Sequence, residues 1–239
     1  FGSSHLGSIL FQAAWAMVLS ECRRRRAPLV RLLLLGSTLA ASLLWAAPPK
    51  GYEDAALALV KEPDTGVVFG DELNEQALVA TGTRKKFGSL SVYAVGLYLD
   101  KKCKMWGSAA SAPELLKQAP GKATLRLVIT SRLVTNARMK EALREGLEPR
   151  LKEGCGDARE AARIQSEFLS ALTSSGSFSV GTNIFFELLQ DGVMIQVDKA
   201  QTKVQGAALA RALLAIYVDK KAVSPAFRDA IFASLKGSS

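Results

Sequence analysis

Histidine and cysteine are both scarce in this chain of 239 residues. The only histidine is His5, and the three cysteines, Cys22, Cys103 and Cys155, stand far apart with no paired spacing. Beyond its first few residues the chain therefore cannot build a histidine triad, a histidine general base or a histidine-rich metal site. An odd, scattered set of cysteines is typical neither of a disulfide framework nor of a zinc site. We expect no metal and no cofactor.

Acidic residues are also outnumbered, with 22 against 31 basic residues and a net charge of +9. The excess is uneven, because residues 1–47 hold five arginines and a single glutamate. In residues 48–239 the bases are scattered in runs of at most three, with acidic residues between the runs. This pattern is typical of a solvated basic surface rather than of a nucleic-acid interface. We therefore expect no nucleic-acid partner.

The longest apolar run is Leu32–Ala47, which is shorter than the about 20 residues of a membrane-spanning helix. It follows four consecutive arginines and precedes two prolines, an order typical of a targeting segment, for which Met17 is a candidate start. We expect residues 1–49 to be a leader that is cleaved, retained as a membrane anchor or folded as a soluble helix. Residues 50–239 are then the folded domain. The leader predicts an organellar (plastid) or secretory location, with membrane association through its apolar segment.

Short runs rich in β-branched and aromatic residues, bounded by turn residues, predict strands. The polar segment Lys85–Ser89 is expected to form a turn, and the pair Asp191-Gly192 between two apolar runs predicts a hairpin. The predicted strands cover 66–70, 77–83, 90–99, 123–130, 182–189 and 193–198.

Helices are predicted where a capping residue precedes apolar residues at helical spacing. One begins after Thr135, with Met139 and Leu143 on its apolar face, and Pro149 is expected to disturb its end. The others cover 111–121, begin after Asp157, cover 207–218 and begin at Ser224-Pro225. Strands in antiparallel pairs, with helices clustered between and after them, indicate an α+β fold.

Three segments in this order resemble the chalcone isomerase family: Gly82–Arg84 with Val92–Asp100, then Gly181–Asp198, then Ala208–Ile231. The resemblance implies an open-faced β-sandwich, in which an antiparallel sheet is backed by a layer of helices and encloses an apolar pocket. Members of the family cyclise chalcones to flavanones, bind fatty acids through an arginine and a tyrosine, or act as non-catalytic partners.

Arg84 stands where the family keeps its arginine, so the resemblance makes it the group that binds a phenolate, an enolate or a carboxylate. A guanidinium can offer two parallel donors to such an anion. Tyr93 stands where the enzymes carry threonine and the fatty-acid-binding branch carries tyrosine, whose hydroxyl can donate to a carboxylate. From the residues alone, Arg84 also fits a surface arginine beside two lysines, and Tyr93 fits a packing residue.

The isomerases carry further polar contacts, a tyrosine, an asparagine and a serine or threonine, where this chain has Thr135, Ala142 and Ile216. Only Arg84 is kept, so the resemblance disfavours isomerase activity and leaves no catalytic residue to name. The pocket is expected to be lined by Val92, Val95, Thr135, Met139, Ala142 and Ile216. Glu141, Glu145 and Glu148 fall along one stripe of the same helix, which favours a solvated face.

Three functions remain open. The first is a non-catalytic protein that binds a fatty acid or another apolar carboxylate through Arg84 and Tyr93. The second is an intramolecular lyase that cyclises a chalcone, and the third is a membrane-tethered scaffold or partner protein. The missing polar contacts argue against the second, and the sequence does not separate the first from the third.

Overall fold

The computed structural model describes residues 58–86, 90–108 and 110–237. The predicted leader, with its apolar segment 32–47, lies outside these residues. Where the chain is described, no helix combines the length and the apolar character needed to cross a membrane.

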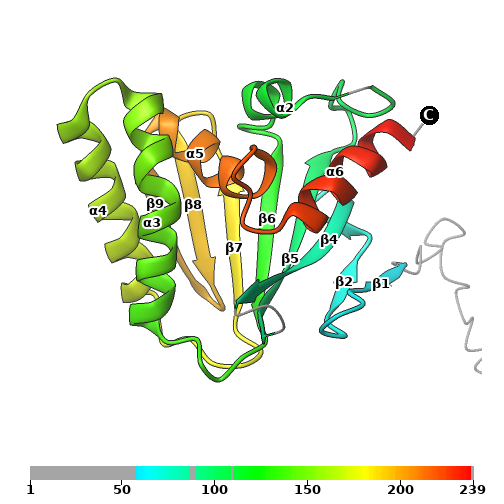
Figure 1. Cartoon of the computed structure of the whole chain (residues 1–239), viewed down its shortest axis with the longest axis horizontal. Helices are drawn as coiled ribbons and strands as arrows, with labels where there is room; N and C mark the ends of the chain where they lie inside the picture. The colour runs from blue at the N-terminus through cyan, green and yellow to red at the C-terminus, as the bar shows by residue number, and fades with distance from the viewer. Residues whose placement is uncertain (1–57, 87–89, 109, 238–239) are drawn as a thin grey trace, which may run out of the picture. The chain divides into compact units, whose positions relative to one another are not determined.

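The fold is built on a curled antiparallel sheet of seven strands in the order β3-β4-β5-β6-β7-β8-β9 (Figure 1). Each of these strands pairs antiparallel with the next strand in chain order, so the sheet is a meander into which helices are inserted. Its strands are β3 Glu72–Leu73, β4 Gln76–Lys86, β5 Leu90–Asp100, β6 Ala123–Ile129, β7 Asn183–Leu188, β8 Gly192–Val197 and β9 Ala200–Gln205. A separate hairpin pairs β1 Leu59–Lys61 with β2 Val68–Gly70.

Helices cover one face of the sheet (Figure 1). The long helices α3 and α4 lie side by side at one end, and α6 lies across β4 at the other. Between them α5 is buried on almost every side, so it forms the centre of the helical layer. The helices of the described chain are α2 Ala112–Gln118, α3 Asn136–Cys155, α4 Ala158–Ser174, α5 Ala207–Val218 and α6 Pro225–Gly237. This arrangement confirms the predicted α+β class and the open-faced sandwich.

Alternation along β5 separates two apolar layers. Tyr93, Val95 and Leu97 join the main core under the helices, whereas Ala94 and Tyr98 face a smaller cluster on the other side. That cluster is closed by Phe69 of the β1–β2 hairpin. Because side chains alternate between the faces of a strand, this one strand contributes to both layers.

A glycine lets α6 approach the sheet. A Cβ atom at Gly82 of β4 would lie 2.6 Å from the Cβ atom of Phe227. The side-chain hydroxyl of Ser224 also donates to the carbonyl of Thr83 at 3.0 Å and accepts the amide of Phe227, so it ties the start of α6 to β4.

Several boundaries differ from the prediction. Strand β4 runs through Lys85 and Lys86, which were predicted to belong to the turn. Pro149 does not end its helix, and α3 continues to Cys155 because Leu151 anchors the following turn in the core. Pro149 is exposed. The backbone carbonyl that loses its helical hydrogen-bond donor to the proline can therefore bind water. Strands β1, β3 and β9 were not predicted.

Candidate ligand-binding site

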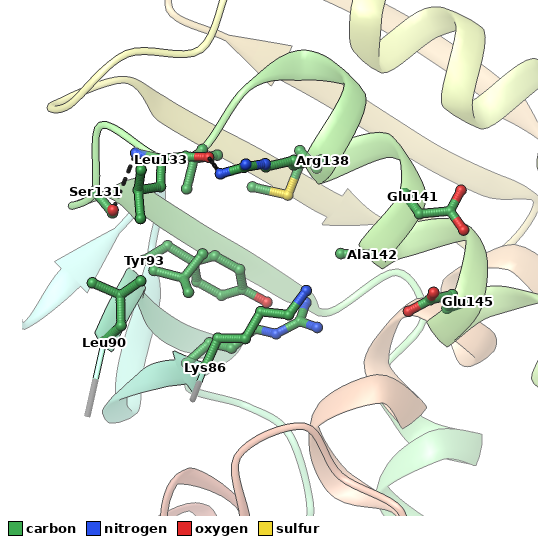
Figure 2. Close-up of a pocket in the computed structure, with 13 residues that line it drawn as sticks. Lys86, Leu90, Tyr93, Ser131, Leu133, Arg138, Glu141, Ala142 and Glu145 are labelled. Carbon is green, nitrogen blue, oxygen red and sulfur yellow. Dashed lines mark hydrogen bonds between the residues drawn. The ribbon is translucent and has the colours of Figure 1, made fainter. Parts of the chain in front are cut away.

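A cavity of about 440 Å³ opens where the first turns of α3 face the hairpin of β4 and β5 (Figure 2). Its lining is mostly apolar, with charged side chains from both β4 and α3. The lining residues are Arg84, Lys86, Leu90, Val92, Tyr93, Ser131, Leu133, Val134, Arg138, Met139, Glu141, Ala142 and Glu145. The volume falls within the about 300–1,000 Å³ typical of small-molecule sites.

Arg84 and Tyr93 are direct partners across the β4–β5 ladder, so both side chains reach the cavity from the sheet. The guanidinium carbon of Arg84 lies 5.8 Å from the centre of the Tyr93 ring, which is within the range of a cation–π contact. Burial alone would lower the pKa of Arg84, but the neighbouring Tyr93 hydroxyl, with smaller contributions from Tyr217 and Glu145, raises it. Arg84 is therefore a permanent positive charge held against the sheet.

Behind this pair lies a second tyrosine that the sequence analysis did not single out. The hydroxyl oxygens of Tyr93 and Tyr217 are 3.0 Å apart, and either can be the donor. Tyr217 is fully buried in α5, and its ring meets that of Phe227 edge to face. Desolvation, with the adjacent Tyr93, raises the pKa of Tyr217 well above its ordinary value. Tyr217 therefore stays neutral and anchors the Tyr93 hydroxyl.

The cavity brings together five of the residues proposed from the sequence. Arg84 and Tyr93 stand at the sheet, with Val92 beside them, and Met139 and Ala142 face them from α3. Val92, Met139 and Ala142 offer only apolar surface. Among these five residues, Arg84 and Tyr93 therefore supply the polar groups. The serine, leucine and valine of the 131–134 loop complete the wall and had not been predicted.

Three residues predicted to line the pocket lie elsewhere. Val95 is completely buried in the main core, two residues beyond Tyr93 along β5. Ile216 is also in the core, where its side chain packs against Gly146 of α3. Thr135 is exposed and caps α3, because its hydroxyl accepts the amide of Arg138 at 3.3 Å. None of the three is among the residues that line the cavity.

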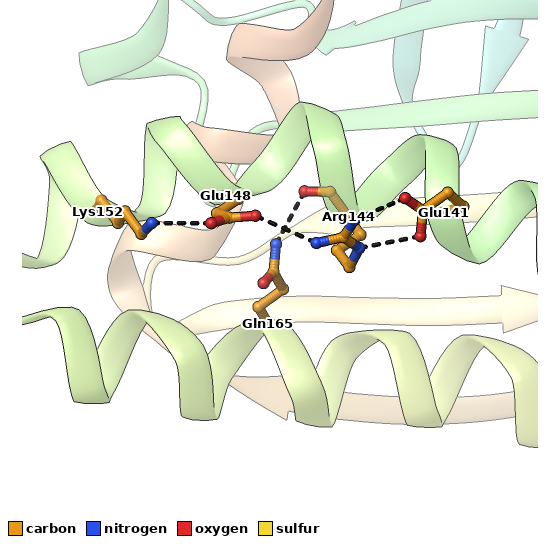
Figure 3. A network of polar contacts seen from close by, with 5 residues as sticks. All are labelled: Glu141, Arg144, Glu148, Lys152 and Gln165. Carbon is orange, nitrogen blue, oxygen red and sulfur yellow. Dashed lines mark hydrogen bonds and ion pairs between the residues drawn. The ribbon is translucent and has the colours of Figure 1, made fainter.

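Two carboxylates reach the rim of the cavity, Glu141 and Glu145 (Figure 2). The sequence placed them on a solvated stripe, and both are indeed exposed. Glu141 is bound by Arg144, which also contacts Glu148 (Figure 3). This hydrogen bond lowers the pKa of Glu141, so its carboxylate stays ionised. The stripe therefore serves as both a solvated face and the outer edge of the cavity.

A family profile described as chalcone isomerase-like matches residues 55–233 of this chain. The chain belongs to the chalcone isomerase-like family. The match covers the sheet, the helices and the cavity together, which confirms the resemblance found in the three segments. No curated protein matches the chain in sequence.

Among solved structures, the Arabidopsis thaliana fatty-acid binding protein AtFAP1 is similar in fold. The superposition has a TM-score of 0.63 and covers 75% of this chain and 99% of that chain, with 20% sequence identity. At this identity the likeness concerns the fold. Within the described ranges, no group of three or more histidine, cysteine, aspartate or glutamate residues could hold a metal ion.

Proposed function

We propose that this protein binds a fatty acid or a similar apolar carboxylic acid without transforming it. Arg84 carries the proposal, since it is a half-buried guanidinium at the wall of a mainly apolar cavity. A ligand with one anionic end and an apolar body matches that distribution of groups. The fold shared with a protein titled as a fatty-acid binding protein is consistent with it.

The carboxylate would lie against Arg84 and the hydroxyl of Tyr93. The contact between the Tyr93 and Tyr217 hydroxyls supports this, because Tyr217 can donate to Tyr93 and leave the Tyr93 proton for a ligand oxygen. The apolar body would lie along Val92, Leu133, Met139 and Ala142. Each buried methylene group would contribute about 0.8 kcal/mol.

The same walls disfavour cyclisation of a chalcone. Ala142 has no polar group, Ile216 is buried away from the cavity, and the Thr135 hydroxyl is occupied in capping α3. None of these three positions then offers a polar group that could hold a phenol or a developing enolate.

The test is a titration of the purified full chain with dodecanoate, in which binding is measured by isothermal titration calorimetry. Substitution Arg84→Gln removes a charge-assisted hydrogen bond of about 1.5–3 kcal/mol, so we expect binding about 10- to 150-fold weaker. Arg228→Gln is the matched control, because Arg228 is also half-buried but lies on α6 and pairs with Asp229. Wild-type protein that binds no dodecanoate, or an Arg84→Gln variant that binds it as well, would refute the proposal.

A further inference from the structure

Large apolar side chains are exposed to solvent on two loops at the end of the sheet next to the cavity. Leu133 is 54% exposed although it also lines the cavity, and Val180 is 51% exposed on a neighbouring loop. Asn136 joins the two loops, since its amide donates to the carbonyl of Gly176 at 2.7 Å and its side-chain oxygen accepts the amide of Phe178 at 2.9 Å. Figure 1 shows both loops at the same end of the sheet.

The loop that carries Leu133 is held in this position. The Arg138 guanidinium donates to the Leu133 carbonyl at 3.0 Å, and the Leu133 amide donates to the Ser131 hydroxyl at 3.2 Å (Figure 2). The Val134 amide also donates to the carbonyl of Ser131 at 3.1 Å. Because the backbone is bonded on both sides of Leu133, its exposed side chain is a fixed feature of the surface.

In the two loops that carry Leu133 and Val180, the charged residues are of one sign. Residues 129–140 hold two arginines and one lysine and no acidic residue, and residues 174–186 hold no charged residue. Lys86 adds a basic side chain from the opposite rim (Figure 2). The carboxylates that reach the rim, Glu141 and Glu145, stand on α3, and Glu141 is bound by Arg144. The two loops and the rim at Lys86 are therefore basic and apolar together.

We propose that this surface, made of Lys86, Arg132, Leu133, Arg138 and Val180, docks on an anionic lipid bilayer. Basic side chains are attracted to the charged head groups, and exposed apolar side chains gain by entering the interface between head groups and acyl chains. Docking would place the cavity mouth against the source of an apolar acid. That transfer role rests on the proposed function, whereas the docking itself does not.

The test is flotation of the full chain with vesicles of phosphatidylglycerol and phosphatidylcholine in equal parts, and with phosphatidylcholine alone. The double variant Arg132→Glu/Val180→Asp changes the surface without touching a residue that lines the cavity. Its matched control is Lys220→Glu/Leu59→Asp, which alters the charge equally at exposed positions of the α5–α6 loop and of β1. Dodecanoate titration in vesicle-free solution is run on all three proteins.

We expect the wild type and the control to bind the anionic vesicles and not the neutral ones. The surface variant should bind at least about tenfold more weakly, since each basic side chain contributes about fivefold near an anionic surface, and should still bind dodecanoate. Failure of the wild type to bind anionic vesicles, or equal binding by both double variants, would overturn the docking surface. Docking by a wild type that binds no dodecanoate would instead overturn the transfer role and the proposed function.

Discussion

The hydroxyl groups of Tyr93 and Tyr217 contact each other at 3.0 Å from opposite layers of the fold, one on the sheet and one on α5. Both side chains are at most 1% exposed, so in the unliganded protein each hydroxyl depends on a partner inside the fold. The Tyr93 hydroxyl is the hydrogen-bond partner of Tyr217, and Arg84 also lies beside Tyr93. The pair links the wall of the cavity to the centre of the helical layer.

The substitution Tyr217→Phe should leave the Tyr93 hydroxyl buried without this partner. We expect a loss of about 1–3 kcal/mol in the free energy of unfolding, measured with urea. The double variant Tyr93→Phe/Tyr217→Phe should lose less than the sum of the two single losses, because it leaves no orphaned hydroxyl. Additive losses would mean that the two hydroxyls do not depend on each other.

Alkaline pH should destabilise the protein through Tyr217. Its pKa is raised in the folded state, mainly by desolvation, so above about pH 10 the unfolded chain loses this proton while the folded chain keeps it. The unfolded state then binds fewer protons, and the free energy of unfolding falls by up to about 1.4 kcal/mol per pH unit. Below pH 10 this group contributes no pH dependence.

Comparison of the wild type with Tyr217→Phe isolates that contribution. Urea unfolding between about pH 8 and pH 11 should show a steeper loss in the wild type than in the variant. Tyr98, whose pKa is also raised by burial, stays in both proteins and cancels. Parallel curves above pH 10 would contradict the buried, neutral state of Tyr217.

Arg150 and Asp219 form a bidentate ion pair between α3 and the end of α5, with contacts of 2.8 and 3.0 Å. Their side chains are only 12% and 28% exposed. We expect Asp219→Ala to cost about 3 kcal/mol of unfolding free energy, because Arg150 is left partly buried without its counter-charge. In contrast, Glu160→Ala breaks an exposed pair with Arg163 and should cost less than about 1 kcal/mol. Similar losses in both variants would argue against this difference.

Gly82→Ala should loosen α6, because the added methyl group would overlap the Cβ atom of Phe227, which cannot move without its helix. We expect a cost of about 1–3 kcal/mol and faster amide exchange in α6. Gly146→Ala is the comparison, since its methyl group would meet only the end of the Ile216 side chain at 3.1 Å. A helical glycine also gains by becoming alanine, so that variant should be close to neutral.

The sequence predicted the helices and strands whose apolar residues recur at a regular spacing, and it missed the strands without such a pattern. Residues 207–218 were predicted with the bounds that α5 has. By contrast, the sequence of β9 is mostly polar. The strand buries only Val204, because it is the edge strand of the sheet and one of its faces is open. The exposed residues of β1 give even less signal. Such strands are specified by their partners, which a local pattern does not contain.

The candidate site shows the same limit. Arg84 and Tyr93 were found through the family resemblance, but their pairing depends on the register of β4 and β5, which shifts immediately after Arg84. Ile216 was expected at the pocket, whereas the next residue, Tyr217, reaches toward it. One position on a helix is a rotation of about 100°, so choosing between them requires the orientation of α5 against the sheet.

Burial on both faces of β5 has a consequence for how the protein tolerates change. A strand at the surface accepts substitutions at every second position, but seven consecutive residues of β5, Tyr93 to Leu99, have no side facing water. A deep mutational scan should therefore show this strand as an unbroken intolerant stretch, with glycine favoured at position 96, where a side chain would strike Phe69. Variation that tunes ligand preference would then accumulate at the exposed positions of α3 and of the 131–134 loop that line the same cavity, such as Leu133 and Arg138.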